Sequence, residues 1–137
     1  AQSARFLMPF TSLGLAPEGS SSFLLPRTMG LQRASELLLF SESFDAEKAC
    51  RYGLVNEVFA DEELTTAVDE RVAKLAALPA ASLRASKKLL REPVREEIRR
   101  VMMREGDVFI ERLGSPEAVE AFTAFMEKRK PDFAQFN

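Results

Sequence analysis

The stretch Leu13–Gly30, LGLAPEGSSSFLLPRTMG, places a single carboxylate in a segment of apolar and small residues. Glu18 is the only charged side chain between positions 6 and 26. Pro17 restricts the backbone before it and Gly19 frees the backbone after it, which suits a turn that presents one side chain. The apolar spacing that follows is helical. The reason for a lone acid at this turn is the question that the rest of the sequence has to answer.

The composition is that of a globular chain of 137 residues. Hydrophobic residues make up 46% and charged residues 29%, yet no apolar run approaches the roughly 20 residues that cross a bilayer, which excludes a membrane span. The net charge is −2 and basic residues alternate with acidic ones. This charge pattern gives no indication of nucleic-acid binding.

The chain contains no histidine and one cysteine, Cys50. Without histidine, the chain by itself cannot build a Ser-His-Asp or Cys-His centre or most transition-metal sites, so we expect no metal. A single cysteine forms no internal disulfide, and the N-terminus lacks the basic and apolar segments of a secretory signal. We therefore expect a reducing, cytoplasmic location. Proton transfer falls to a carboxylate, a lysine, Tyr52 or Cys50.

Hydrophobic periodicity predicts a mainly helical chain with one or two short strands. The first part is predicted to contain a strand over 4–10 broken by Pro9, a loop over 11–19, a helix from Ser20, a helix over 31–40, and a helix over 46–52 that Asp45 caps and Gly53 ends. Residues 54–59 read as a short strand or an extended connector. The second part is predicted to be helical throughout. Its first helix is capped by Asp61 and has Leu64, Val68, Val72 and Leu75 on one face. A helix over 81–91, a longer helix opened by Pro93 and ended by Gly114, and a last helix from Ser115 to about Arg129 follow.

Two interpretations of Glu18 follow from residue chemistry, and the residues alone leave both open. In the first, Glu18 lies beside a helix N-terminus, where an anion gains about 0.3–1 kcal/mol. In the second, it faces an apolar pocket lined by Phe10, Leu13, Leu15 and Phe23. Burial there would favour the neutral carboxylic acid and suit a general base.

Residues 4–59, from ARFLMPF to LVNEVF, resemble the second half of a crotonase-superfamily (enoyl-CoA hydratase/isomerase) subunit. They are most similar to the Δ3,Δ2-enoyl-CoA isomerase branch, which carries a PF…LGL.PEG.SS signature. The tail FMEKRKPDF, residues 125–133, is similar to the F.EKRKP.F ending of the family. The resemblance implies the C-terminal portion of a crotonase-like α/β fold, a ββα superhelix.

The resemblance implies that Glu18 is the catalytic base of a 1,3 proton shift on an unsaturated acyl-CoA in fatty acid β-oxidation. Family hydratases carry a second carboxylate after a proline at the end of the preceding strand, and this chain has Phe10 after Pro9. Phe10 cannot transfer a proton, which disfavours two-carboxylate hydration. No cofactor is implied, because CoA is part of the substrate.

The resemblance also implies what lies outside this chain. The family's oxyanion-hole donors and much of its CoA-binding surface come from the preceding half, so we expect the isolated chain to be inactive. Backbone N–H groups from Gly19 to Ser22 are a weaker candidate for an anion site. Phe125 and Lys128 would contact CoA from a neighbouring subunit, against the alternative of a solvated basic helix end.

By the same resemblance, residues 1–60 would end the catalytic core and carry the active-site turn. Residues 61–137 would form a helical oligomerisation region of a trimer or a dimer of trimers. Two other functions stay open. One is another crotonase activity, such as enoyl-CoA hydration or thioester hydrolysis, with a carboxylate from the preceding half. The other is a non-catalytic oligomerisation module.

Overall fold

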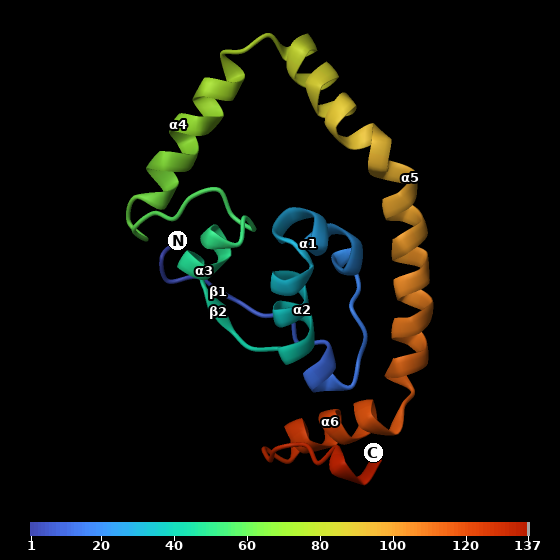
Figure 1. Cartoon of the computed structure of the whole chain (residues 1–137). Helices are drawn as coiled ribbons and strands as arrows, with labels where there is room; N and C mark the ends of the chain where they lie inside the picture. The colour runs from blue at the N-terminus through green and yellow to red at the C-terminus, as the bar shows by residue number, and fades with distance from the viewer. Residues whose placement is uncertain (137) are drawn as a thin grey trace. The chain divides into compact units, whose positions relative to one another are not determined.

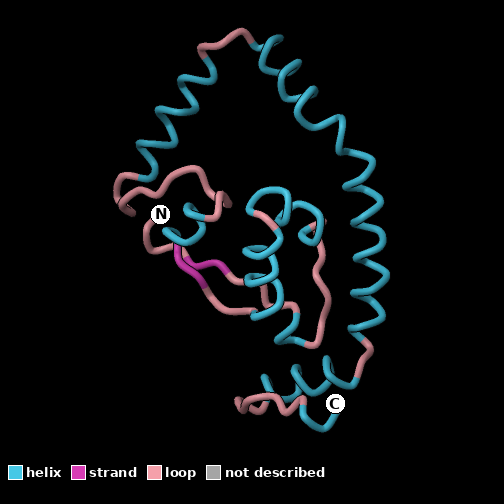
Figure 2. Tube along the Cα trace, in the orientation of Figure 1, coloured by secondary structure: helices cyan, strands magenta, loops and turns pink. Residues whose placement is uncertain are grey.

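The computed structural model describes residues 1–136, which form two compact units. One unit contains Ala1–Phe6 and Phe44–Ile98, and the other contains Leu7–Ser43 and the chain from Arg99 onward. Figure 1 labels the elements along the chain, and Figure 2 shows that helices dominate the trace, with one short pair of strands. The prediction of a mainly helical chain with one or two strands is therefore confirmed.

In the first unit, strand β1 (Arg5–Phe6) pairs antiparallel with strand β2 (Phe44–Asp45). The rings of Phe6 and Phe44 face each other across this pair with centroids 5.4 Å apart. The strand predicted over 4–10 is thus limited to two residues. Backbone pairing defines a strand, and β2 offers only two partners.

Helix α3 (Ala46–Arg51) begins as its cap predicts. The Oδ1 atom of Asp45 accepts a hydrogen bond from the Lys48 backbone N–H at 2.7 Å, which satisfies one free donor of the first turn. Gly53 follows the helix with a φ of 76°, the left-handed conformation that glycine adopts at no steric cost. Residues 54–59 contain no strand: residues 54–56 are bends, and the Leu54 N–H donates back to the Ala49 carbonyl at 2.9 Å, so the extended form expected there is absent from the first half of the segment.

The cap predicted for helix α4 (Leu64–Ala76) is wrong. Asp61 instead accepts a hydrogen bond at 3.0 Å from the Ser3 backbone N–H, and hydrogen bonding to Ser3 lowers the pKa of Asp61. Glu63 occupies the cap position without a side-chain bond. Asp61 therefore fastens the N-terminal segment within this unit. Asp61 lies two residues before the cap position and binds Ser3, 58 positions away, a contact that sequence spacing does not reveal.

Helix α5 (Ala80–Leu113) is continuous, with Pro93 inside it. Two separate helices, meeting at Pro93, were the wrong expectation. Proline removes one backbone donor and crowds the preceding turn, but the residues on both sides keep helical geometry here. The helix ends at Leu113, next to the predicted stop at Gly114.

The second unit has its core where helix α1 (Ser21–Met29) packs on helix α2 (Leu31–Phe40). A short 3₁₀ turn, η1 (Thr11–Leu13), contacts both α2 and helix α6 (Pro116–Met126). The buried apolar side chains of these helices are Phe23, Leu25, Met29, Ala34, Leu37, Leu38, Ala118, Ala121 and Ala124. The small alanine face of α6 allows close approach of its backbone.

Helix α6 begins and ends by recognisable caps. Ser115 accepts a hydrogen bond from the Ala118 backbone N–H at 3.2 Å, as predicted. The end lies three residues before the predicted Arg129, because Lys128 adopts a φ of 55° and the Arg129 N–H turns back to the Ala124 carbonyl at 2.9 Å. A second 3₁₀ turn, η2 (Ala134–Phe136), follows.

The two contact units do not follow the boundary expected near residue 60. The division into a catalytic portion, 1–60, and an oligomerisation region, 61–137, stays a prediction. None of the helices within residues 1–136 has the length and apolarity of a bilayer span.

Candidate functional site

The turn that carries Glu18 is built from left-handed backbone conformations. Gly19 has a φ of 67° and Ser20 a φ of 61°. The Ser21 N–H closes the turn by donating to the Glu18 carbonyl at 3.1 Å. Ser20 is completely buried, although a left-handed conformation is uncommon for a residue with a Cβ atom. Its surroundings must therefore hold it.

The carboxylate of Glu105, on α5, accepts hydrogen bonds from the residues that follow Glu18 in this turn. Its Oε2 atom accepts from the Ser20 backbone N–H at 2.5 Å. Its Oε1 atom accepts from the Ser22 backbone N–H at 2.9 Å and from the Ser22 hydroxyl at 2.5 Å. Glu105 is 7% exposed. Of the N–H groups expected to offer an anion site, those of Ser20 and Ser22 thus bind a protein carboxylate and that of Ser21 binds the Glu18 carbonyl, which corrects that expectation for these three residues.

The segment before the turn is fastened at Gly14. The guanidinium Nε atom of Arg112 donates to the Gly14 carbonyl at 3.2 Å, and the same side chain pairs with Glu117 at 3.0 Å. A Cβ atom at Gly14 would lie 2.7 Å from the Ala118 nitrogen, so the loop backbone packs directly on the first turn of α6. Hydrogen bonds from its own backbone N–H and from Arg112 lower the pKa of Glu117.

Glu18 itself is exposed. Within residues 1–136 its carboxylate has no hydrogen-bond or ion-pair partner. The dry surroundings expected for it are not supplied by the side chains of this chain. The turn is held through its backbone, which leaves the carboxylate projecting from a fixed point.

The four predicted pocket residues lie near one another along the chain but differ in burial. Phe10, Leu13 and Leu15 are joined by one turn, in which the Phe10 carbonyl accepts from the backbone N–H groups of the other two at 3.1 and 2.8 Å. All three are half-buried, whereas Phe23 on α1 is 8% exposed and is covered by the Arg27 guanidinium. Their role in binding an acyl chain stays a prediction.

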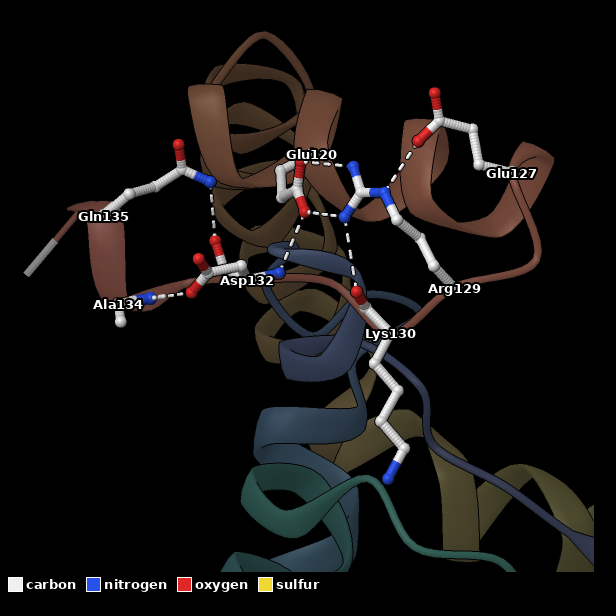
Figure 3. Close-up of polar contacts among 7 residues, drawn as sticks. All are labelled: Glu120, Glu127, Arg129, Lys130, Asp132, Ala134 and Gln135. Atoms are coloured by element: carbon white, nitrogen blue, oxygen red, sulfur yellow. Dashed lines mark hydrogen bonds and ion pairs between the residues drawn. The ribbon is translucent and has the colours of Figure 1, made fainter.

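The C-terminal candidates Phe125 and Lys128 are both exposed, Phe125 by 76%. The guanidinium of their neighbour Arg129, in contrast, already binds carboxylates of this chain. Figure 3 shows its guanidinium between two carboxylates, with Glu120 at 2.5 and 2.9 Å and Glu127 at 2.6 Å. The backbone N–H of Asp132 also donates to Glu120 at 2.8 Å. Hydrogen bonding to Arg129, and then to Asp132, lowers the pKa of Glu120 to about 2.

A cavity of about 490 Å³ lies along α5, in the first unit. Its lining is mostly basic: Lys87, Lys88, Arg91, Glu92, Arg95 and Ile98. None of the predicted site residues lines it. The structure therefore gives this cavity no part in the candidate site.

The family model described as enoyl-CoA hydratase/isomerase matches residues 1–136. The chain belongs to the enoyl-CoA hydratase/isomerase family. This confirms the resemblance to the crotonase superfamily that the residues around Glu18 indicate.

Relatives of this family member carry both isomerase and hydratase names. The human protein named enoyl-CoA delta isomerase 2 is 37% identical over 126 residues, which are 92% of this chain and 32% of that protein. A probable enoyl-CoA hydratase of Rhodobacter capsulatus is 35% identical over 133 residues, 97% of this chain and 52% of that protein. The chain thus spans between a third and about half of the length of these relatives.

A solved structure shows that the enoyl-CoA hydratase/isomerase fold extends over almost the whole chain. The crystal structure of an enoyl-CoA hydratase/isomerase from Pseudoalteromonas atlantica T6c matches with a TM-score of 0.91 and 42% identity. The match covers 96% of this chain and 53% of that one. The fold is therefore a portion of the crotonase-like fold, as expected.

Sequence reasoning missed Glu105 as a part of this site. A signal was present, because positions 94, 98, 101 and 108 form an apolar stripe with helical spacing, and residue 105 falls on it. An acid at a position that faces the core needs buried donors. The sequence could have raised that question, but it could not name Ser20 and Ser22 as the donors.

Proposed function

We propose that this chain carries the general base of a Δ3,Δ2-enoyl-CoA isomerase, and that the base is Glu18. The observation that carries the proposal is a lone exposed carboxylate on a turn whose backbone is fixed on both sides. The name of the human relative, an enoyl-CoA delta isomerase, supports this choice within the family. The substrate would be an unsaturated acyl-CoA of fatty acid β-oxidation.

The proposed reaction needs one base on one face of the substrate. Glu18 removes a proton from C2 of a 3-enoyl thioester, and the negative charge spreads over the dienolate. The protonated Glu18 then returns the proton to C4, which leaves the double bond between C2 and C3. Backbone N–H donors would stabilise the thioester oxygen by about 3–4 kcal/mol each, and the family half that precedes this segment is expected to supply them.

The residue that follows Pro9 favours isomerisation over hydration. Phe10 stands where family hydratases are expected to carry their second carboxylate, and an aromatic ring neither activates water nor donates a proton. Half-buried Phe10, Leu13 and Leu15 instead offer apolar surface to an acyl chain. Water would then be excluded from the dienolate.

The exposed Glu18 requires a cover for this chemistry. Because the relatives are two to three times as long as the matched segment, we infer that the rest of a full-length subunit or a neighbouring copy closes over the turn. The C-terminal residues Phe125 and Lys128 would approach the CoA of a neighbouring subunit in a trimer or a dimer of trimers. A cytoplasmic location is part of the same proposal.

The test is the conversion of 3-enoyl-CoA to 2-enoyl-CoA by the full-length natural protein and by its Glu18→Gln variant. Loss of a general base is expected to lower kcat by about 10²–10⁴-fold. Glu42→Gln, an exposed glutamate in the same unit, is the matched control and should keep the parent rate. Activity that survives Glu18→Gln would overturn the assignment.

The same preparations separate the alternatives. Hydration of 2-enoyl-CoA in the absence of isomerisation would favour a hydratase that takes its acid from another part of the subunit. Helix α4 favours the second alternative, an assembly module, because Val68, Val72 and Leu75 of its predicted apolar face are about half exposed. Oligomerisation of the chain with no activity, alone or mixed with a separately expressed preceding half, would select that module.

A further inference from the structure

We propose that Glu105 is a positioning residue for Glu18, acting through the backbone of the turn at the start of α1. The inference rests on the proposed function of Glu18 as the base. Glu105 touches neither the substrate nor the reacting atoms in this proposal. Its task is to hold the backbone from which the Glu18 side chain projects.

The geometry links the two residues through a short covalent path. Glu105 accepts from the N–H of Ser20, which is two residues after Glu18, and from both the N–H and the hydroxyl of Ser22. The Glu18 carbonyl in turn accepts from the Ser21 N–H, which lies between the two bonded serines. The carboxylate therefore spans the residues that close the Glu18 turn.

The conformation of Ser20 shows why the turn needs this bond. A serine in the left-handed region is strained by about 1–2 kcal/mol, and such a conformation persists only where its surroundings determine it. Ser20 is completely buried at a φ of 61°. The 2.5 Å bond from its N–H to Glu105 is one of the contacts that hold this conformation, together with the hydrogen bonds that its carbonyl accepts from the Phe23 and Leu24 N–H groups at 3.1 and 2.8 Å.

Packing alone does not account for a glutamate at this position. A buried carboxylate is unfavourable unless its oxygens are hydrogen-bonded, and an apolar residue would fill the same stripe of α5 without that requirement. Three donors converge on Glu105 at the positive end of a helix of nine residues. The arrangement gives partners both to the free N–H donors at the start of α1 and to the buried carboxylate oxygens of Glu105. It also sets where α1 begins relative to Glu18.

Catalytic rates depend steeply on such placement. A displacement of about 1 Å of a catalytic group can lower a rate about 10²-fold. Loosening the turn would let the Glu18 carboxylate sample positions away from C2 and C4 while leaving the surfaces that bind the acyl chain and CoA in place. The expected signature is a lower kcat with an almost unchanged KM.

The test compares Glu105→Gln and Glu105→Ala with the parent in the full-length protein. By the placement argument, kcat should fall by about 10-fold for Glu105→Gln, whose amide can no longer accept from every donor, and by about 10²-fold for Glu105→Ala. KM should change less than about threefold, since binding surfaces remain. Equal kcat values per folded protein for all three would overturn the proposal.

Asp45→Ala is the matched control, because it also removes the acceptor that caps a helix, at the start of α3 in the other unit. It should lower the melting temperature without lowering kcat. If both Glu105 variants fail to fold, Ser22→Ala decides the question, because it removes only the hydroxyl donor to Glu105. A kcat about threefold lower is then expected from the loss of one bond, and an unchanged kcat contradicts the proposal.

A double variant distinguishes this proposal from the function on which it rests. If Glu105 acts only through Glu18, adding Glu105→Gln to Glu18→Gln should produce little further loss, because residues that act as a unit are not additive. A full multiplicative loss would contradict positioning. An inactive Glu18→Gln beside a fully active Glu105→Gln would overturn the positioning role alone. An active Glu18→Gln would overturn the proposed function itself.

Discussion

Gly14 illustrates how a single residue fixes the candidate site. Its φ of 68° is open to glycine, and its backbone lies against the first turn of α6 with no room for a side chain. Gly19 has nearly the same φ, but nothing lies within 4 Å of the place where its Cβ would stand. A side chain added at Gly19 would therefore meet backbone strain alone, whereas one added at Gly14 would meet backbone strain and a steric clash.

Gly14→Ala should destabilise the protein more than Gly19→Ala. The shared left-handed conformation costs about 1–2 kcal/mol for alanine, which is the whole effect expected at Gly19. Gly14→Ala adds a backbone clash, with a Cβ to nitrogen distance of 2.7 Å, that should cost a further 1–3 kcal/mol or so. Denaturant unfolding of both variants measures the difference. Equal losses would show that α6 moves aside freely.

Glu120 predicts a pH dependence of stability. Its ordinary pKa of 4.5 is lowered to about 2, first by the hydrogen bond from Arg129. A lowered pKa means that the folded state favours the ionised acid, so its stabilising contribution is present above pH 4.5 and is lost as the pH falls toward 2. Glu120→Gln should therefore be less stable at neutral pH and lose less stability on acidification.

The measurement is the melting temperature of the parent and of Glu120→Gln between neutral pH and pH 2. Glu127→Gln is the matched control, because Glu127 binds the same arginine with a side chain that is 57% exposed, against 12% for Glu120. Solvent screening should make its effect small. Parallel curves for the parent and Glu120→Gln would contradict the prediction.

At the scale of elements, α5 is the clearest departure from sequence expectation. Proline usually marks a helix start, and Pro116 does so at the first position of α6. Pro93 has the same residue type but lies within a single helix. Pro116 follows the cap residue Ser115, whereas Pro93 follows Glu92, a residue that is itself within the helix.

Pro93→Ala should stabilise α5. A proline in a helix interior is about 3 kcal/mol less favourable than alanine, so the gain can reach that value. Pro116→Ala is the control, since the first helical position needs no N–H donor, and its effect should stay within about 0.5 kcal/mol. Circular dichroism during urea unfolding gives both values. A loss of stability in Pro93→Ala would show that α5 depends on the proline for its local geometry.

At the scale of the whole molecule, the chain carries more apolar surface than its own contacts cover. Helix α4 has no buried residue, and the strongly exposed side chains of α5 and α6 include Leu89, Leu90, Ile110, Phe125 and Met126. The matched relatives extend well beyond the segment compared here. Both facts agree with the proposal that further protein surface, from the same subunit or another copy, completes the fold and covers Glu18.

The amino-acid sequence by itself determined the helical character of the chain and the caps of α3 and α6, but not the cap of α4 or the continuity of α5. Asp45 and Ser115 each bond the N–H three residues on, and such contacts are set by local spacing. The PEG turn and its neighbours also sufficed to indicate the family, because the residues that carry the resemblance lie in one continuous stretch.

Only the tertiary structure decided how the turn is held. Glu105 meets Ser20 and Ser22 across more than eighty positions of sequence, and Gly14 meets the start of α6 across about a hundred. It also left Glu18 exposed, whereas the residues alone leave open whether Glu18 lies beside a helix N-terminus or in an apolar pocket. The physical reason is that burial and long-range hydrogen bonds depend on which surfaces meet in space, whereas caps and helical periodicity depend on neighbours along the chain.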